Sequence, residues 1–248
     1  MRFVDVDARS VDRLGFFCCM SKKKSEGYQR KLRWVKERFS EGMRVKLLEL
    51  PERGFIEYLP GEHAWRPVQD AEGWLFVHCL WVVGRSKGKG FGEALLGDCL
   101  AEAKKAGARG VAMIASEGNW LAGRTLLERQ GFESVDEAGP SYSLMIKAFK
   151  RGPLPSFPRN WDERLRRLGK GVTVVRTDQC PYLDDAARHV LEVCAKLKKK
   201  ARVLELGSAR EVHEAAPSPY GTFAIVDDGR LVADTFVLEK DLLPRLRG

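Results

Sequence analysis

Apolar residues recur at two different spacings along residues 1–149, and each spacing predicts a type of element. A spacing of three and four residues places Tyr28, Leu32, Val35 and Phe39 on one face of a helix, which Gly42 ends. Largely apolar segments predict strands at residues 43–50, 54–59, 74–81, 110–115 and 141–149. Two more helices are predicted, one starting near Phe91 and one ending near Gln130 before a C-cap glycine, Gly131.

A second pattern begins after a proline-rich segment, residues 151–158. It predicts strands at residues 171–176 and 201–206, a helix from Asp184, a hairpin over residues 222–236 and a last helix at 239–246. We therefore expect an α/β (α+β) protein with two domains, residues 1–150 and 171–248. A Pro/basic linker, residues 151–170, would join them.

Composition favours a water-soluble enzyme or binding protein. The chain has 248 residues, of which 44% are hydrophobic and 31% charged, and no apolar run reaches membrane-spanning length. The segment after Met1 is too polar for a signal peptide, so we expect a cytoplasmic protein without membrane contact. The net charge of +9 comes from basic residues interleaved with acidic ones, which does not favour nucleic acid as a partner.

Cysteine and histidine usage argues against a metal and against a disulfide framework. The six cysteines include no C-x-x-C pair, and the four histidines show no ligand spacing. We therefore expect no metal.

The residues 84–92 form a glycine-rich basic turn between a predicted strand and a predicted helix. A helix N-terminus has unpaired N–H groups and partial positive charge, so such a turn suits a phosphate. The spacing excludes a P-loop, because Gly84 and Gly88 are separated by three residues, and it excludes the dinucleotide fingerprint, because Gly88, Gly90 and Gly92 alternate.

What remains is basic-x-x-Gly-x-Gly, which resembles the acetyl-CoA pyrophosphate loop of the GNAT superfamily of N-acetyltransferases. A second set of residues resembles the fourth motif of that superfamily: Asn119, Ala122, Leu126, Gly131 and Phe132. Further segments resemble the YoaP-type acetyltransferases, which carry a second domain at the C-terminus: Phe17-Cys18, residues 21–24, Gly27-Tyr28, residues 55–58, residues 64–66 and residues 78–81. The resemblance implies a GNAT fold with a mixed, mostly antiparallel sheet, plus a thioredoxin-like domain.

The resemblance also implies acetyl-CoA as co-substrate and direct acetyl transfer to an amine of a small molecule or amino-acid-like acceptor. It assigns the donor site to Trp81, Val82, Val83, Lys87, Gly88, Lys89, Gly90, Phe91, Gly92 and Asn119. The backbone N–H of Val82 would polarise the thioester carbonyl. For Asn119, a helix N-cap is an equal alternative to a CoA contact.

An acceptor amine must lose a proton, and Glu57 and His78 are the candidate bases on strands beside the predicted cleft. The alternatives are a solvent-facing strand residue for Glu57 and a core imidazole for His78. The loop that contains Glu62, His63 and Arg66 mixes charges and aromatic residues, as substrate-binding loops often do.

The proton donor to the leaving thiolate is less defined, because Leu127 stands where the superfamily often has a tyrosine. Tyr142, Ser116, a water or direct release of the thiolate remain as alternatives.

The segment Cys180-Pro181-Tyr182 matches the glutaredoxin active-site turn, but Leu183 replaces its second cysteine and Gly221 replaces its cis-proline. A dithiol reductase lacks its resolving thiol here. Cys180 is then a possible reactive thiol, or the domain is redox-inactive. An alternative function follows, a CoA-binding, thiol-based redox or sensing adaptor with little acetyl transfer. These patterns predict no particular oligomeric state.

Overall fold

The computed structural model describes residues 2–117 and 120–247. The chain divides into two compact units: unit 1 contains Met1–Met20, Leu32–Ala64 and Val68–Phe157, and unit 2 contains Ser21–Lys31, Trp65–Pro67 and Pro158–Gly248. Two short stretches of the N-terminal half, Ser21–Lys31 and Trp65–Pro67, thus belong to unit 2, although the sequence places them in the first domain.

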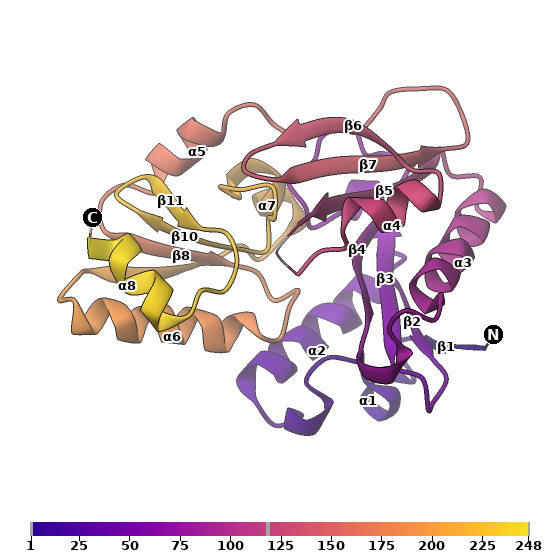
Figure 1. Cartoon of the computed structure of the whole chain (residues 1–248), viewed down its shortest axis with the longest axis horizontal. Helices are drawn as coiled ribbons and strands as arrows, with labels where there is room; N and C mark the ends of the chain where they lie inside the picture. Colours follow the sequence, from indigo (N-terminus) through magenta and orange to yellow (C-terminus); the bar gives the residue numbers. More distant parts are fainter. Residues whose placement is uncertain (1, 118–119, 248) are drawn as a thin grey trace. The chain divides into compact units, whose positions relative to one another are not determined.

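Unit 1 contains a seven-stranded sheet in the order β1-β2-β3-β4-β5-β7-β6 (Figure 1). Its strands are β1 (Phe3–Val6), β2 (Arg44–Leu48), β3 (Gly54–Pro60), β4 (Leu75–Val82), β5 (Gly110–Ser116), β6 (Glu133–Ala138) and β7 (Tyr142–Ala148). Neighbouring strands are antiparallel except β4 and β5, which are parallel. The sheet is therefore mixed and mostly antiparallel, as expected.

The first helices of the chain are α1 (Val11–Leu14), η1 (Met20–Lys22) and α2 (Glu26–Phe39). Residues 32–39 of α2 belong to unit 1. The next helices are η2 (Gly61–His63), η3 (Gly84–Ser86), α3 (Phe91–Lys105) and α4 (Arg124–Arg129).

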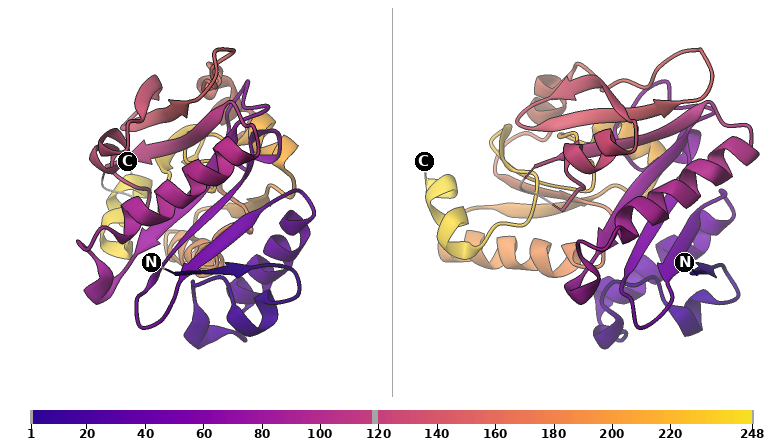
Figure 2. Two further views of the ribbon diagram at one scale, coloured as in Figure 1. Left: turned by 90° about the vertical axis from the view of Figure 1, so that its right-hand side faces the viewer. Right: turned by 45° about the vertical axis from the view of Figure 1, so that its right-hand side comes forward.

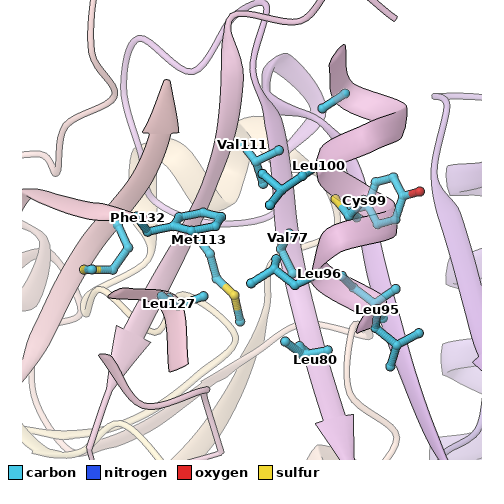
Figure 3. Packing of buried hydrophobic residues seen from close by; sticks show 14 of the residues in the cluster. Val77, Leu80, Leu95, Leu96, Cys99, Leu100, Val111, Met113, Leu127 and Phe132 are labelled. Atoms are coloured by element: carbon cyan, nitrogen blue, oxygen red, sulfur yellow. The ribbon is translucent and has the colours of Figure 1, made fainter. Parts of the chain in front are cut away.

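The main core of unit 1 lies between the sheet and α3, which packs on β3, β4 and β5 (Figure 2). Leu95, Leu96, Cys99 and Ala103 recur at helical spacing on α3, and all are fully buried. They meet Val77 and the other strand residues of the cluster in Figure 3. Burying this apolar face holds the start of α3 against the end of β4.

One strand of the sheet, β6, was not expected from the sequence. Its residues, Glu-Ser-Val-Asp-Glu-Ala, are mostly polar and only half-buried or exposed. They pair on one side, with β7, at the edge of the sheet. Edge strands often carry charged side chains, which discourage pairing with another chain, so an apolar pattern does not reveal β6.

Unit 2 contains a four-stranded sheet in the order β11-β10-β8-β9. The strands are β8 (Val172–Arg176), β9 (Ala201–Glu205), β10 (Phe223–Asp227) and β11 (Arg230–Ala233), and the helices are α5 (Trp161–Arg167), α6 (Leu183–Lys196), α7 (Ala209–Ala215) and α8 (Glu239–Arg247). β8 and β9 are parallel, whereas β10 is antiparallel to both β8 and β11.

The helices α5 and α7 were not expected, and α5 lies inside the segment predicted as a linker. Arg164 of α5 is buried and donates to the carbonyl oxygens of Ala216 at 3.0 Å and His213 at 2.6 Å, at the end of α7. These bonds satisfy carbonyls that a helix C-terminus leaves unpaired, so each short helix stabilises the other.

Within residues 2–117 and 120–247, no helix has both the length and the apolar character that a membrane span requires. The same residues contain no group of three or more His, Cys, Asp or Glu side chains arranged to hold a metal ion.

Candidate active site

The glycine loop, residues 87–92, leads from η3 into the first turn of α3, and its residues 87–90 are exposed. Gly88 and Gly90 have φ angles of +74° and +76°, a region that favours glycine. A Cβ atom added at Gly88 would meet nothing within 4 Å. The N–H groups of residues 91–93 lie in the first turn of α3, where no helical carbonyl can accept from them. The loop thus has the open space and the backbone donors that a phosphate group requires.

Ser86 holds the glycine loop against the turn before β3. Its hydroxyl is buried, donates to Glu52 Oε2 at 2.6 Å and accepts from the Arg53 N–H at 2.9 Å. Lys89 Nζ lies 3.5 Å from Glu52 Oε1, whereas Lys87 is exposed. Glu52 therefore neutralises part of the positive charge of the loop, and Lys87 is the lysine more available to an anion.

The end of β4 diverges from β5, which makes room beside the glycine loop. The two strands pair only from Leu75 to Val77, although β5 continues to pair with β7 as far as Ser116. The Val83 N–H donates to Arg53 O at 3.0 Å, on the β3 side. Because N–H directions alternate along a strand, the Val82 N–H is directed toward the side where β5 has diverged. Its role as a donor to the thioester stays a prediction.

A β-bulge brings Glu57 and His78 together. Glu57 pairs with Cys79 and Tyr58 pairs with Val77, so His78 is the extra residue on β4. His78 Nδ1 lies 3.9 Å from Glu57 Oε1, and both residues are 1% exposed. The expectation that Glu57 could be a solvent-facing residue is wrong, because both faces of β3 are covered.

Glu57 and His78 lie on the sheet face opposite α3. Ile56 and Tyr58 belong to the core under α3, so the side chain of Glu57 between them is directed to the other face. On that face the His78 ring lies 6.1 Å from the ring of Trp34 in α2. The two candidate bases thus share one buried environment.

An aromatic wall, which sequence reasoning missed as a group, lies at the end of β4: Phe17, Phe55, Trp81 and Trp120. Phe17 stacks on Phe55 at 4.9 Å and meets Trp81 edge-on at 6.3 Å, and Trp81 meets Trp120 at 6.0 Å. The only local signal was the pair of phenylalanines at 16 and 17. Asn119 lies outside the described residues.

The candidate proton donors are buried. Leu127 is fully buried in the core under α3. Tyr142 is 2% exposed at the start of β7, directly opposite Ser116. The Ser116 and Ser141 hydroxyl oxygens lie 2.8 Å apart.

The three predicted substrate-binding residues do not fall in one unit. Glu62 is exposed and His63 half-buried in η2 of unit 1, whereas Arg66 belongs to unit 2. The Arg66 guanidinium is 2% exposed. It donates to Tyr220 O at 2.9 Å, to Gln179 Oε1 at 3.2 Å and to Thr222 Oγ1.

Cys180 lies half-buried in the turn before α6. The Cys180 carbonyl accepts from the Leu183 N–H at 3.2 Å. Gly27, also in unit 2, packs so closely on this turn that an added Cβ would lie 2.1 Å from Pro181 O. Among the described residues no cysteine forms a disulfide.

Comparison with known proteins identifies the family. No family model matches the chain. The uncharacterized N-acetyltransferase YoaP of Bacillus subtilis (strain 168) is 30% identical over 236 residues, which are 94% of this chain and 93% of that protein. The chain belongs to the family of the N-acetyltransferase YoaP. Because 236 residues exceed the length of the N-terminal domain, the similarity to this N-acetyltransferase extends into the C-terminal part.

Several solved structures are similar to part of this chain. The ribosomal-protein-alanine N-acetyltransferase of Brucella melitensis is 18% identical, covers 60% of this chain and 100% of its own, and has a TM-score of 0.43. A GNAT family acetyltransferase of Brucella melitensis in complex with acetyl-CoA is 19% identical, with coverage of 63% and 94% and a TM-score of 0.37. A PaiA N-acetyltransferase from Thermoplasma acidophilum in complex with coenzyme A is 17% identical, with coverage of 60% and 100% and a TM-score of 0.38.

Proposed function

We propose that the enzyme binds acetyl-CoA at the glycine loop and transfers the acetyl group directly to an amine of a small molecule or amino-acid-like acceptor. The observation that carries this proposal is the open loop at the start of α3 beside the diverging ends of β4 and β5. Bound acetyl-CoA would supply an activated acetyl thioester.

The donor site would use mainly backbone groups. The N–H groups at the start of α3 and the charge of Lys87 would hold the pyrophosphate, because both provide positive potential at one place. The backbone of Trp81 and Val82, on the edge of β4 that is turned away from β3, would pair with the pantetheine, and Val83 would follow it at the start of the loop. The Val82 N–H would donate to the carbonyl oxygen as negative charge develops there.

Proton removal from the acceptor would use Glu57 or His78, directly or through water. Because His78 Nδ1 and Glu57 Oε1 are 3.9 Å apart, a proton would pass between these two atoms through a water or after a small movement of one side chain. Leu127 cannot donate a proton, although it stands where the superfamily often has a tyrosine. We therefore assign protonation of the CoA thiolate to Tyr142 or Ser116.

We also infer that residues 171–248 form a thioredoxin-like domain that lacks dithiol chemistry. The order β8-α6-β9-α7-β10-β11-α8, with a parallel pair next to an antiparallel pair, supports this inference. Leu183 is 5% exposed and offers no resolving thiol. The cytoplasmic location stays a prediction.

Isothermal titration of acetyl-CoA tests the donor site. Gly90→Asp forces a side chain into a backbone conformation that favours glycine and adds a negative charge near the pyrophosphate, so affinity should fall by roughly 100-fold. Gly97→Ala is the matched control, since a Cβ atom at this α3 position meets nothing within 4 Å. Equal affinities of Gly90→Asp and wild-type protein would refute the assignment.

Thiol release from acetyl-CoA across a panel of amines tests the acceptor. We expect at least one small amine to stimulate release, and Cys180→Ser to leave that rate unchanged. If no amine stimulates release, or if release requires Cys180, direct transfer to a small amine is wrong.

A further inference from the structure

The exposure of the rings increases along the aromatic wall, from Phe55 in the protein interior to Trp120 at the surface. Phe55 is 2% exposed, Phe17 and Trp81 are half-buried, and Trp120 is 48% exposed. All four belong to unit 1 and adjoin one another through the ring contacts given above. An exposed tryptophan continuous with buried rings offers a flat surface to a ligand that has an aromatic face of its own.

The backbone that positions Phe17 is strained. Phe17 and Cys19 have φ angles of +80° and +53°, which are uncommon for residues other than glycine and rarest for bulky ones. Phe16, fully buried, anchors the segment from one side. Strain of this kind is typical of binding and catalytic sites, where the surrounding structure holds a side chain in a required direction.

Two members of the wall, Phe55 and Trp81, lie on the same sheet face as the candidate bases. Phe55 and Trp81 are directly opposite on β3 and β4, and Glu57 is two residues along β3 from Phe55. Cross-strand partners and residues two apart share one face. An amine attached to a ring on this wall would therefore extend along the face that contains Glu57.

The charge at the rim distinguishes between classes of amine. The exposed Arg53 guanidinium lies 5.9 Å from the Phe17 ring centroid. Glu52, next to it in the chain, already pairs with Ser86 and Lys89. A cationic rim repels a polyamine most, because a polyamine carries several positive charges, and it attracts a carboxylate such as the one that an amino acid carries. It therefore favours an aromatic amino acid over an arylalkylamine, which carries one positive charge and no carboxylate.

We infer that the acceptor is a primary amine borne on an aromatic group, such as an aromatic amino acid or an arylalkylamine. This inference rests on the proposed function, because it gives the acceptor class for the same site. The ring would stack on the exposed Trp120, which Trp81 and Phe17 support from the protein side, and the amine would be directed along β3 toward Glu57.

Two readouts on the full-length protein separate this inference from the proposed function. The first is kcat/KM for acetylation of phenylalanine, tryptophan, phenethylamine and tryptamine, compared with spermidine, lysine and glucosamine. The second is binding of the same amines in the absence of acetyl-CoA, measured by saturation-transfer NMR. We expect the aromatic amines to exceed the others by roughly tenfold or more in kcat/KM and to give the stronger transfer signals.

Variants of the wall complete the test. Trp120→Leu and Phe17→Leu keep an apolar side chain but remove the ring, so KM for the aromatic amines should rise about tenfold with little change in kcat. Trp120 is exposed, so its replacement should leave the fold intact. Phe236→Leu is the control, because Phe236 is a 40% exposed aromatic residue of unit 2.

The outcomes are distinct. Preferred acetylation of spermidine or lysine would overturn the aromatic inference and leave acetyl transfer standing. Binding of aromatic amines that depends on Trp120, without acetylation of any amine, would support the aromatic site and refute the proposed function. An aromatic preference that Trp120→Leu and Phe17→Leu leave unchanged would overturn the wall as its source.

Discussion

The glycine loop and the Glu57–His78 pair belong to one proposed site but are built in different ways. The loop is a contiguous stretch, exposed over residues 87–90, whose donors are backbone N–H groups. The pair consists of two side chains from different strands, both 1% exposed and brought together by a bulge. Changes in the loop should therefore affect binding with little effect on stability, whereas changes at buried polar groups can affect both.

The comparison extends to other buried polar groups of the chain. On the α3 face, Lys46 bonds to Glu102 and lies 2.5 Å from Asp98, and the Tyr58 hydroxyl donates to Glu102 at 2.5 Å. Arg66 is similarly engaged in unit 2. Burial by itself thus does not distinguish a catalytic polar group from one that holds elements together. Substitutions distinguish the two roles, because a catalytic group affects kcat whereas a structural group affects the free energy of unfolding.

The largest effect is expected from Glu57→Gln, which keeps the shape of the side chain but removes the proton acceptor. If Glu57 is the base, kcat should fall by roughly 10²- to 10⁴-fold while the affinity for acetyl-CoA stays unchanged. Steady-state kinetics with the best acceptor, beside acetyl-CoA titration, measure this. An unchanged kcat would leave His78 as the candidate.

Arg66→Met is expected to lower the free energy of unfolding by about 3 kcal/mol, because it leaves the buried acceptors of Arg66 without their donor. Denaturant unfolding measures the loss. Arg166→Met is the control, since Arg166 is exposed on α5 of the same unit. If stability is unchanged and only the acceptor KM rises, Arg66 binds substrate, as the sequence suggests.

Acid should destabilise unit 1 partly through Glu102. Burial alone would raise the pKa of Glu102, but hydrogen bonds from Lys46 and Tyr58 outweigh it and lower the pKa. The unfolded state then binds the proton more readily, so this contribution is present above the usual glutamate pKa and is lost as the pH falls through the lowered one. Thermal melts of wild type and Glu102→Gln from neutral to acidic pH should converge as the pH falls; parallel curves would contradict this.

The smallest effect is expected from Glu52→Gln. This change removes a negative charge 3.5 Å from Lys89 and keeps a group that can accept from Ser86. Acetyl-CoA should bind about two- to fivefold more tightly, most clearly at low salt. Weaker binding would mean that the Glu52 contacts order the loop more than they oppose the anion.

Features that depend on neighbouring residues were predictable from the chain alone. The glycine loop is one, because positive φ angles and the donors of a helix start are properties of a short contiguous segment. The apolar strands and long helices are others, and they agree with the structure to within about two residues at most ends. The polar strand β6 and the short helices α5 and α7 were not predicted from the sequence, since partners distant in the chain stabilise them.

Contacts between distant segments required the folded chain. Local composition made Arg66 a substrate-binding candidate, yet its partners are more than 100 residues away, at Gln179, Tyr220 and Thr222. The bulge at His78 and the aromatic wall likewise depend on contacts between distant segments, and the sequence did not reveal them. Burial and side-chain direction arise from packing between distant segments, whereas spacing along the chain records only local preference.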